Sequence, residues 1–143
     1  MFNAYAKNFI ANNQSIISDL FYGINCNITQ CGGCGIQTFN YQTYFFIVFP
    51  LEEVRKFKNN NNQYNNFNNN IVDIYDCFNY DKKINVMSGD NSMYCNYCKL
   101  TCTSSMCTVL TTGPEILILL LNRGKGIEFD VKINFYENLN LFN

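Results

Sequence analysis

Two short cysteine pairs are the residues of this chain best suited to do chemistry. The first is Cys31-Gly32-Gly33-Cys34, followed at once by Gly35, and the second is Cys95-Asn96-Tyr97-Cys98. Four thiolates in two such pairs form a closed tetrahedral site, which is the usual form of a structural zinc. Gly35 suits a turn of positive φ that directs backbone N–H groups toward the sulfurs. The spacing therefore predicts that one zinc ion is bound, with a disulfide framework or buried free thiols as the alternatives; the predicted ligands are Cys31, Cys34, Cys95 and Cys98.

Four further cysteines have no role that the sequence assigns, and they are Cys26, Cys77, Cys102 and Cys107. Cys26 precedes the first pair closely, and Cys102 and Cys107 follow the second. One of these thiols could replace a sulfur of the zinc site or take part in a disulfide. The other interpretation is that they are small hydrophobic residues or idle exposed thiols.

Length and composition indicate a single domain with a real core, since 48% of the 143 residues are hydrophobic. Small secreted disulfide-rich chains usually open with a signal peptide, and Met1–Ile10 has no apolar stretch of that kind. The longest aliphatic run, Ile116–Leu121, is far shorter than the ~20 residues that span a bilayer. We therefore expect a soluble protein of the cytoplasm or nucleus with no membrane partner.

The charged residues and the missing histidine exclude several function classes. The net charge is −1 and the ten basic residues are scattered, which argues against nucleic acid as a partner. Without histidine, no Ser-His or Cys-His pair can form, and histidine cannot bind a metal. Four cysteine ligands leave no open position on the zinc, so we expect a structural ion and no catalytic residue in this chain.

Apolar spacing predicts two helices near these pairs. In Ala11–Gly23 the apolar residues lie on one face of a helix that Ser15 would cap and Gly23 would end. The segment Ile71–Tyr80 has the same helical spacing.

Three segments have strand patterns, and together they predict a strand-dominated α+β fold. Gln42–Phe49 is apolar on both faces, which favours burial on both sides over a face that docks a partner. Ile116–Leu121 is also predicted to be a strand buried on both faces. Gly126–Phe135 alternates and is predicted to be half-buried, joined to the preceding strand by a hairpin at Gly124-Lys125-Gly126.

The segment Asn59–Asn70 reads NNNNQYNNFNNN. It has too little apolar surface to offset the entropy of ordering it, so we expect a disordered surface loop. A functional prion-like tract is the alternative.

Seven segments in this order resemble the middle of the catalytic domain of the ubiquitin-specific proteases, the cysteine deubiquitinases. They include the two cysteine knuckles, a segment like "I..LF.G" before them and a strand like "P.iLii.LkRf" after them. The match runs from about Ser15 to the end of the chain: Ser15–Gly23, Cys31–Gly35, Gln42–Leu51, Ile71–Tyr80, Tyr94–Cys98, Gly113–Arg123 and Lys132–Leu141.

This resemblance implies that residues 1–143 are a single partial domain, made of zinc-ribbon fingers and part of the palm sheet. In the family the fingers hold the globular body of ubiquitin, so ubiquitin and ubiquitinated proteins are the implied partners. The family's catalytic Cys and His boxes have no counterpart here, so this chain alone is predicted to be an inactive part of a thiol hydrolase. Tyr44 and Phe46 are candidate ubiquitin anchors, although both could belong to the core. A stand-alone zinc-ribbon interaction module without enzymatic activity is the alternative.

Overall fold

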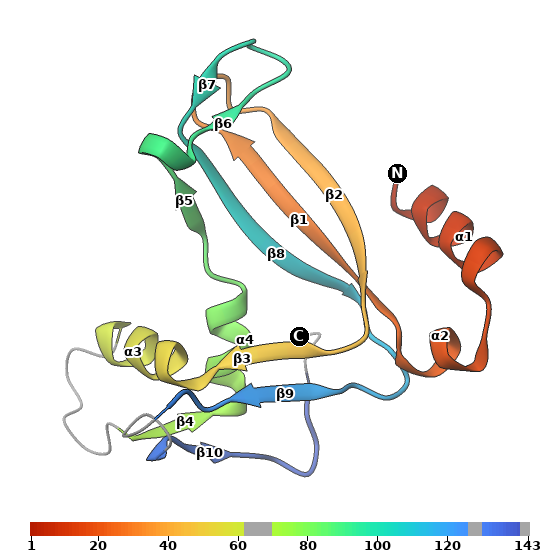
Figure 1. The fold of residues 1–143 in the computed structure, drawn as a ribbon, viewed down its shortest axis with the longest axis vertical. Helices are drawn as coiled ribbons and strands as arrows, with labels where there is room; N and C mark the ends of the chain where they lie inside the picture. The colour runs from red at the N-terminus through yellow and green to blue at the C-terminus, as the bar shows by residue number, and fades with distance from the viewer. Residues whose placement is uncertain (62–69, 126–129, 141–143) are drawn as a thin grey trace. The chain divides into compact units, whose positions relative to one another are not determined.

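The computed structural model describes residues 1–61, 70–125 and 130–140 (Figure 1). Strand residues outnumber helical ones, which confirms the strand-dominated α+β fold class. The chain folds into two units, one formed by Met1–Ile47 and Lys82–Ile118 and the other by Val48–Asp81 and Leu119–Asn143. The single domain spanning residues 1–143 stays a prediction.

An antiparallel sheet forms the frame of the first unit. Its strands lie in the order β2 (Gln37–Tyr44), β1 (Gly23–Cys31), β8 (Ser104–Thr112) and β5 (Asn85–Met87). Figure 1 shows β1, β2 and β8 running side by side toward the turn that holds the two short strands β6 and β7. Neither β1 nor β8 was predicted from the sequence. In β1, Ile24, Cys26 and Ile28 alternate with polar residues, a short strand signal that the prediction missed, whereas the apolar residues of β8 lie in adjacent pairs that break the period-two pattern.

Two helices precede this sheet, α1 (Phe2–Asn13) and α2 (Ile16–Phe21). The structure confirms the predicted Ser15 cap of α2. The N–H of Ser18 donates to Ser15 Oγ at 3.1 Å, and the N–H of Ser15 donates to Ser18 Oγ at 2.9 Å, a reciprocal capping box. Gly23 was predicted to end this helix, but α2 ends at Phe21 and Gly23 is the first residue of β1. A Cβ at Gly23 would lie 2.4 Å from the ring of Tyr44 and 2.6 Å from the backbone carbonyl oxygen of Thr112, so the close approach of the ring and of the neighbouring strand requires glycine.

The predicted strand Gln42–Phe49 is divided in the structure. β2 ends at Tyr44, the chain bends at Phe45, and β3 (Ile47–Pro50) pairs with β9 (Leu119–Asn122). Because β2 pairs with β1 and β3 pairs with β9, the segment is not one strand with two continuous buried faces. Ile47 and Phe49 are buried while Phe46 and Val48 are exposed, so the prediction of burial on both sides was wrong.

The prediction that Ile116–Leu121 is a strand buried on both faces was also wrong. The strand begins only at Leu119, and Ile118 and Leu120 are exposed. β9 belongs to a two-stranded sheet with β3, and an element of that kind leaves part of its surface open.

The predicted hairpin around residue 125 is not the pairing found among the described residues. β9 pairs with β3, whereas β10 (Lys132–Asn134) pairs in parallel with β4 (Ile71–Asp73). Gly124 has a φ of +75°, in keeping with a turn there. Residues 126–129 of the predicted strand lie outside the described residues.

Most of the buried hydrophobic residues lie in the second unit, around α3 (Leu51–Asn61) and α4 (Ile74–Asp81). The predicted helix over Ile71–Tyr80 is confirmed from Ile74 onward, after the short strand β4. Asp73 marks its start, because the Asp73 carboxylate accepts a hydrogen bond from the N–H of Tyr75 at 2.8 Å. The largest fully buried side chains of the described residues all belong to this unit: Phe49, Leu51, Val54, Val72, Ile74, Cys77 and Val131.

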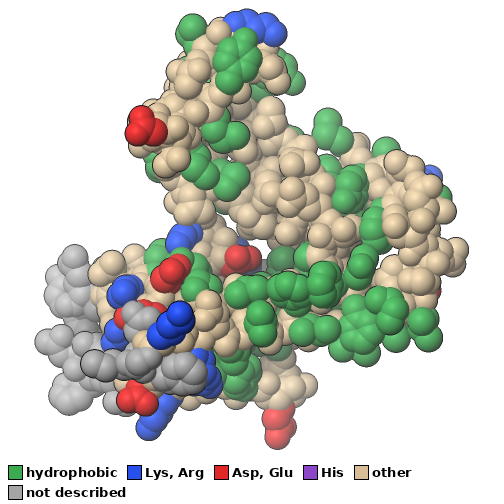
Figure 2. Space-filling model, viewed as in Figure 1, with side chains coloured by type: hydrophobic (Ala, Val, Ile, Leu, Met, Phe, Trp, Pro, Cys, Tyr) green, Lys and Arg blue, Asp and Glu red, His purple; other side chains and the backbone are tan. Residues whose placement is uncertain are grey.

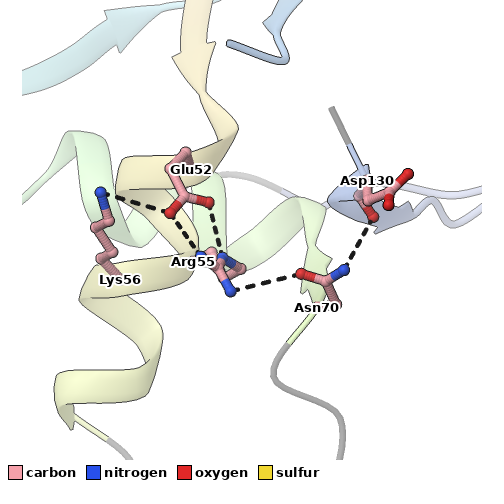
Figure 3. Close-up of polar contacts among 5 residues, drawn as sticks. All are labelled: Glu52, Arg55, Lys56, Asn70 and Asp130. Carbon is pink, nitrogen blue, oxygen red and sulfur yellow. Dashed lines mark hydrogen bonds and ion pairs between the residues drawn. The ribbon is translucent and has the colours of Figure 1, made fainter. Parts of the chain in front are cut away.

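A polar network joins α3 to Asn70 and Asp130, which precede β4 and β10, within the second unit (Figure 3). Arg55 Nε donates to Glu52 at 2.8 Å, and Lys56 lies 3.4 Å from the same carboxylate. Arg55 also reaches Asn70 Oδ1 at 3.5 Å, and the Asn70 amide donates to the Asp130 carbonyl at 3.4 Å. Figure 2 shows Lys and Arg side chains interleaved with Asp and Glu over this part of the unit.

The Asn-rich tract begins inside a helix. Asn59–Asn61 are the last residues of α3, and Asn70 precedes β4. The rest of the predicted disordered loop, residues 62–69, lies outside the described residues. None of the helices in the described ranges is long and apolar enough to cross a membrane.

Candidate metal centre

The first cysteine knuckle is the turn between β1 and β2. The N–H of Gly35 donates to the Cys31 carbonyl at 2.8 Å, and the N–H of Cys31 donates to the Ile36 carbonyl at 3.0 Å. Gly35 has the positive φ predicted for it, +73°. The N–H of Gly32 donates to the Thr103 carbonyl at 2.8 Å, which fixes the knuckle to the chain that enters β8.

The second knuckle repeats this geometry between β6 (Met93–Tyr94) and β7 (Thr101–Cys102), which pair with each other. The N–H of Lys99 donates to the Cys95 carbonyl at 2.9 Å, and the N–H of Cys95 donates to the Leu100 carbonyl at 2.9 Å. Lys99 therefore takes the place that Gly35 has in the first knuckle, and its φ is +59°. This conformation is unfavourable for a residue with a Cβ.

The two knuckles bring the four predicted thiols into one cluster. All four Sγ atoms lie within 4.8 Å of one another. Cys31 Sγ is 3.9 Å from Cys98 Sγ, and Cys34 Sγ is 3.7 Å from Cys95 Sγ. A tetrahedral Zn–S₄ site with bonds of about 2.3 Å has S···S edges of about 3.8 Å, so this donor set fits a zinc ion. Their ligation of zinc stays a prediction.

Backbone N–H groups favour the thiolate form at the first cysteine of each knuckle. The N–H groups of Cys34 and then Gly33 lower the pKa of Cys31 to about 6. In the same way the N–H groups of Cys98 and then Tyr97 lower the pKa of Cys95. A thiolate is the form that binds a metal.

The second cysteine of each knuckle behaves in the opposite way. The N–H of Ile36 acts to lower the pKa of Cys34, but desolvation and the neighbouring thiols outweigh it and raise the pKa to about 11. At Cys98 the N–H of Leu100 is likewise outweighed by desolvation and neighbouring thiols, so its pKa is raised. Four thiolates this close repel one another, and a divalent cation would remove that repulsion.

Apart from the hydrogen bonds described above, the first unit has little apolar packing to hold these knuckles in place. Its buried residues are few, and Cys31, which enters the cluster, is one of them. Both cysteine turns lie at the end of a sheet whose strands are largely polar. A structural metal is the usual device where a small element cannot build its own core.

All eight cysteines lie in the described ranges and are free thiols there, and the four outside the cluster differ in setting. Cys77 lies in the core of the second unit, and burial raises its pKa to about 12, which makes it unreactive. Cys26 is buried in β1, and Cys107 is half-buried in β8. Cys102 lies beside the cluster, with its Sγ 4.0 Å from Cys98 Sγ.

The two aromatic residues considered as ubiquitin anchors have different settings. The Tyr44 hydroxyl donates to the Thr112 carbonyl at 3.0 Å and its ring covers Gly23, so Tyr44 stabilises the sheet. Phe46 is partly exposed and packs edge to face on Phe45, with ring centroids 4.5 Å apart.

Comparison with known proteins finds several relatives that are all called ubiquitin carboxyl-terminal hydrolases. The chain is 32% identical over 116 residues to ubiquitin carboxyl-terminal hydrolase 7 of Saccharomyces cerevisiae, which covers 79% of this chain and 10% of the relative. It is 25% identical over 130 residues to ubiquitin carboxyl-terminal hydrolase 21 of Homo sapiens, covering 91% and 21%. It is 27% identical over 117 residues to ubiquitin carboxyl-terminal hydrolase 4 of Vanderwaltozyma polyspora, covering 82% and 12%. No family model matches the chain. The chain thus spans about a tenth to a fifth of the length of these relatives.

Proposed function

Because this chain belongs to the ubiquitin carboxyl-terminal hydrolase family, and corresponds to a segment of its longer members, we propose that it is the ubiquitin-gripping zinc-ribbon portion of a deubiquitinase. One observation carries the proposal. Two knuckles, whose nearest cysteines in the sequence (Cys34 and Cys95) are 61 positions apart, bring four thiols together at the end of one sheet. Such an element presents a surface rather than a reaction centre, because four cysteine ligands leave a zinc ion no open position.

In this proposal Cys31, Cys34, Cys95 and Cys98 hold one zinc ion. The ion, when bound, cross-links the two knuckles and does no chemistry on a substrate. The chain's own backbone does the positioning. Gly35 and Lys99 turn the two knuckles, and the Gly32–Thr103 hydrogen bond fixes the first of them against the start of β8.

Exposed apolar side chains beside the cysteine cluster are the proposed ubiquitin contacts. Tyr94 and Tyr97 are 59% and 63% exposed, and Met93 and Ile36 are also exposed. All four residues line one pocket together with Cys31 and Cys95. Exposed aromatic and Met side chains around a depression are typical of a protein-docking surface.

The test is a titration of isotope-labelled ubiquitin with the zinc-loaded chain, followed by NMR. We expect localised shifts with weak affinity, because a segment supplies only part of the surface that its longer relatives have. Tyr94→Ala should weaken binding several-fold. Phe135→Ala is the matched control, since Phe135 is equally exposed at 57% but belongs to the second unit, and it should leave binding unchanged.

Absence of any ubiquitin shift with zinc bound would contradict this proposal. It would favour the stand-alone zinc-ribbon interaction module, whose partner would be a different protein. Equal effects of Tyr94→Ala and Phe135→Ala would instead show that ubiquitin binds but that the docking surface is elsewhere.

The remaining parts of the proposal follow from the family. Ubiquitinated proteins would be the substrates of the whole deubiquitinase, and the cytoplasm or nucleus its location. We propose no catalytic residue in this chain, since it has no histidine to serve as the base of a thiol hydrolase.

A further inference from the structure

Cys102 is a fifth thiol next to a site that needs four. Its Sγ lies 4.0 Å from Cys98 Sγ, which is close to the 3.9 Å and 3.7 Å that separate the paired sulfurs within the cluster. It also lies against the first knuckle, because a Cβ added at Gly33 would come within 2.7 Å of Cys102 Sγ. The Cys102 sulfur therefore contacts one residue of each knuckle, and the missing side chain of Gly33 leaves room for it.

A structural zinc site takes four ligands, so Cys102 can join it only by replacing one of them. Cys98 is the ligand best placed to leave. It lies on the same short segment as Cys102, four positions away, and is half-buried. Cys31, in contrast, is buried at the end of β1, where its N–H is bonded to the Ile36 carbonyl.

We propose that Cys102 is a reserve ligand of the metal centre, whose thiolate takes the place of Cys98 when Cys98 is lost or chemically blocked. The inference rests on the proposed zinc site and adds a residue to it. With this reserve ligand, the metal centre would tolerate chemical modification of Cys98 but not of the other three cysteine ligands.

The first experiment measures zinc per chain and zinc affinity by chelator competition, with Co²⁺ absorption as a report of thiolate ligation. Cys98→Ser should keep one metal, with affinity within about tenfold of the wild type. Cys95→Ser and the double variant Cys98→Ser/Cys102→Ser should each lose about a hundredfold or more, since four ligands share the binding energy of a structural zinc. Cys107→Ser is the matched control, a half-buried thiol outside the cluster, and should bind as the wild type does.

A second measurement uses the wild-type chain and so does not depend on a variant that folds. The zinc-loaded chain is alkylated to a limited extent with iodoacetamide and examined by native mass spectrometry. Molecules alkylated at Cys98 alone or at Cys102 alone should retain the metal, and molecules alkylated at both should have lost it.

The inference is overturned if Cys98→Ser loses metal as completely as Cys95→Ser, or if alkylation at Cys98 alone releases the metal. In either case the wild type would still be loaded, and the proposed zinc site would stand. A folded wild-type chain that binds no zinc would overturn the zinc site and this inference together.

Discussion

Gly35 and Lys99 allow a sharp test of how the knuckles are built. Replacing Gly35 by Ala adds one methyl group in a backbone conformation of φ +73°, and the structure places nothing within 4 Å of it. The effect is therefore purely conformational. A left-handed residue with a Cβ costs about 1–2 kcal/mol, and the stiffer unfolded chain of the alanine variant offsets about 0.4–1 kcal/mol of this. The expected net loss is about 1 kcal/mol.

Gly89 provides the matched control. It has a φ of +60° and also has open space around it, but it lies in a short 3₁₀ turn (Gly89–Asn91) that belongs to neither cysteine knuckle. Gly89→Ala should destabilise the chain by a similar amount. Only Gly35→Ala distorts a turn that positions thiols, so only Gly35→Ala should lower zinc affinity, by about fivefold, since 1.4 kcal/mol corresponds to tenfold. Lys99→Gly should act in the opposite direction and leave zinc affinity equal or slightly higher.

The assay is chelator competition for zinc, with thermal unfolding of the same samples. The reasoning fails if Gly35→Ala and Gly89→Ala change zinc affinity equally, because the effect would then be global. It also fails if Gly35→Ala changes neither stability nor affinity, because the positive φ would then not constrain the turn.

Three other outcomes follow from the structure. Phe49→Ala should destabilise the second unit by about 3–5 kcal/mol in chemical denaturation, because Phe49 is 0% exposed and packs edge to face on Phe78. Val48→Ala is the control: Val48 is 41% exposed, so this change should cost less than about 0.5 kcal/mol. Hydrogen bonding and charge from Arg55 lower the pKa of Glu52 below its ordinary value of 4.5, so the ion pair stabilises the fold by about 0.5–1 kcal/mol above that pH. The difference in stability between the wild type and Arg55→Met should therefore disappear as the pH falls through the lowered pKa. A difference that persists at lower pH would exclude the ion pair as its cause. The chain alone should show no turnover of a fluorogenic ubiquitin substrate, and turnover that survives repurification would contradict the inactive-segment proposal.

The cysteine spacing predicted more of the site than of the fold. The CxxC pattern and Gly35 are local signals, and the structure places the four predicted thiols in one cluster. The equivalent turn residue of the second knuckle is Lys99, and no sequence rule assigns a positive φ to lysine. The position of Cys102 depends on the pairing of β6 with β7, where Met93 faces Cys102, so sequence spacing could not place it beside Cys98.

The strands were harder to predict because their pairing is not local. β1 and β8 are the two central strands of the first unit's sheet, and only β1, where Ile24, Cys26 and Ile28 alternate with polar residues, has a period-two pattern. Gln42–Phe49 has no Gly or Pro inside it to mark the bend at Phe45, so its continuous apolar run predicts one buried strand. The helix cap at Ser15 was predictable, because a capping box involves residues only three positions apart.

X-ray absorption spectroscopy at the zinc edge of the purified chain tests the central claim most directly. The account predicts one zinc per chain with four sulfur neighbours at about 2.3 Å and no nitrogen or oxygen ligand. A folded chain without zinc, or a zinc ion with fewer than four sulfur neighbours, would contradict it.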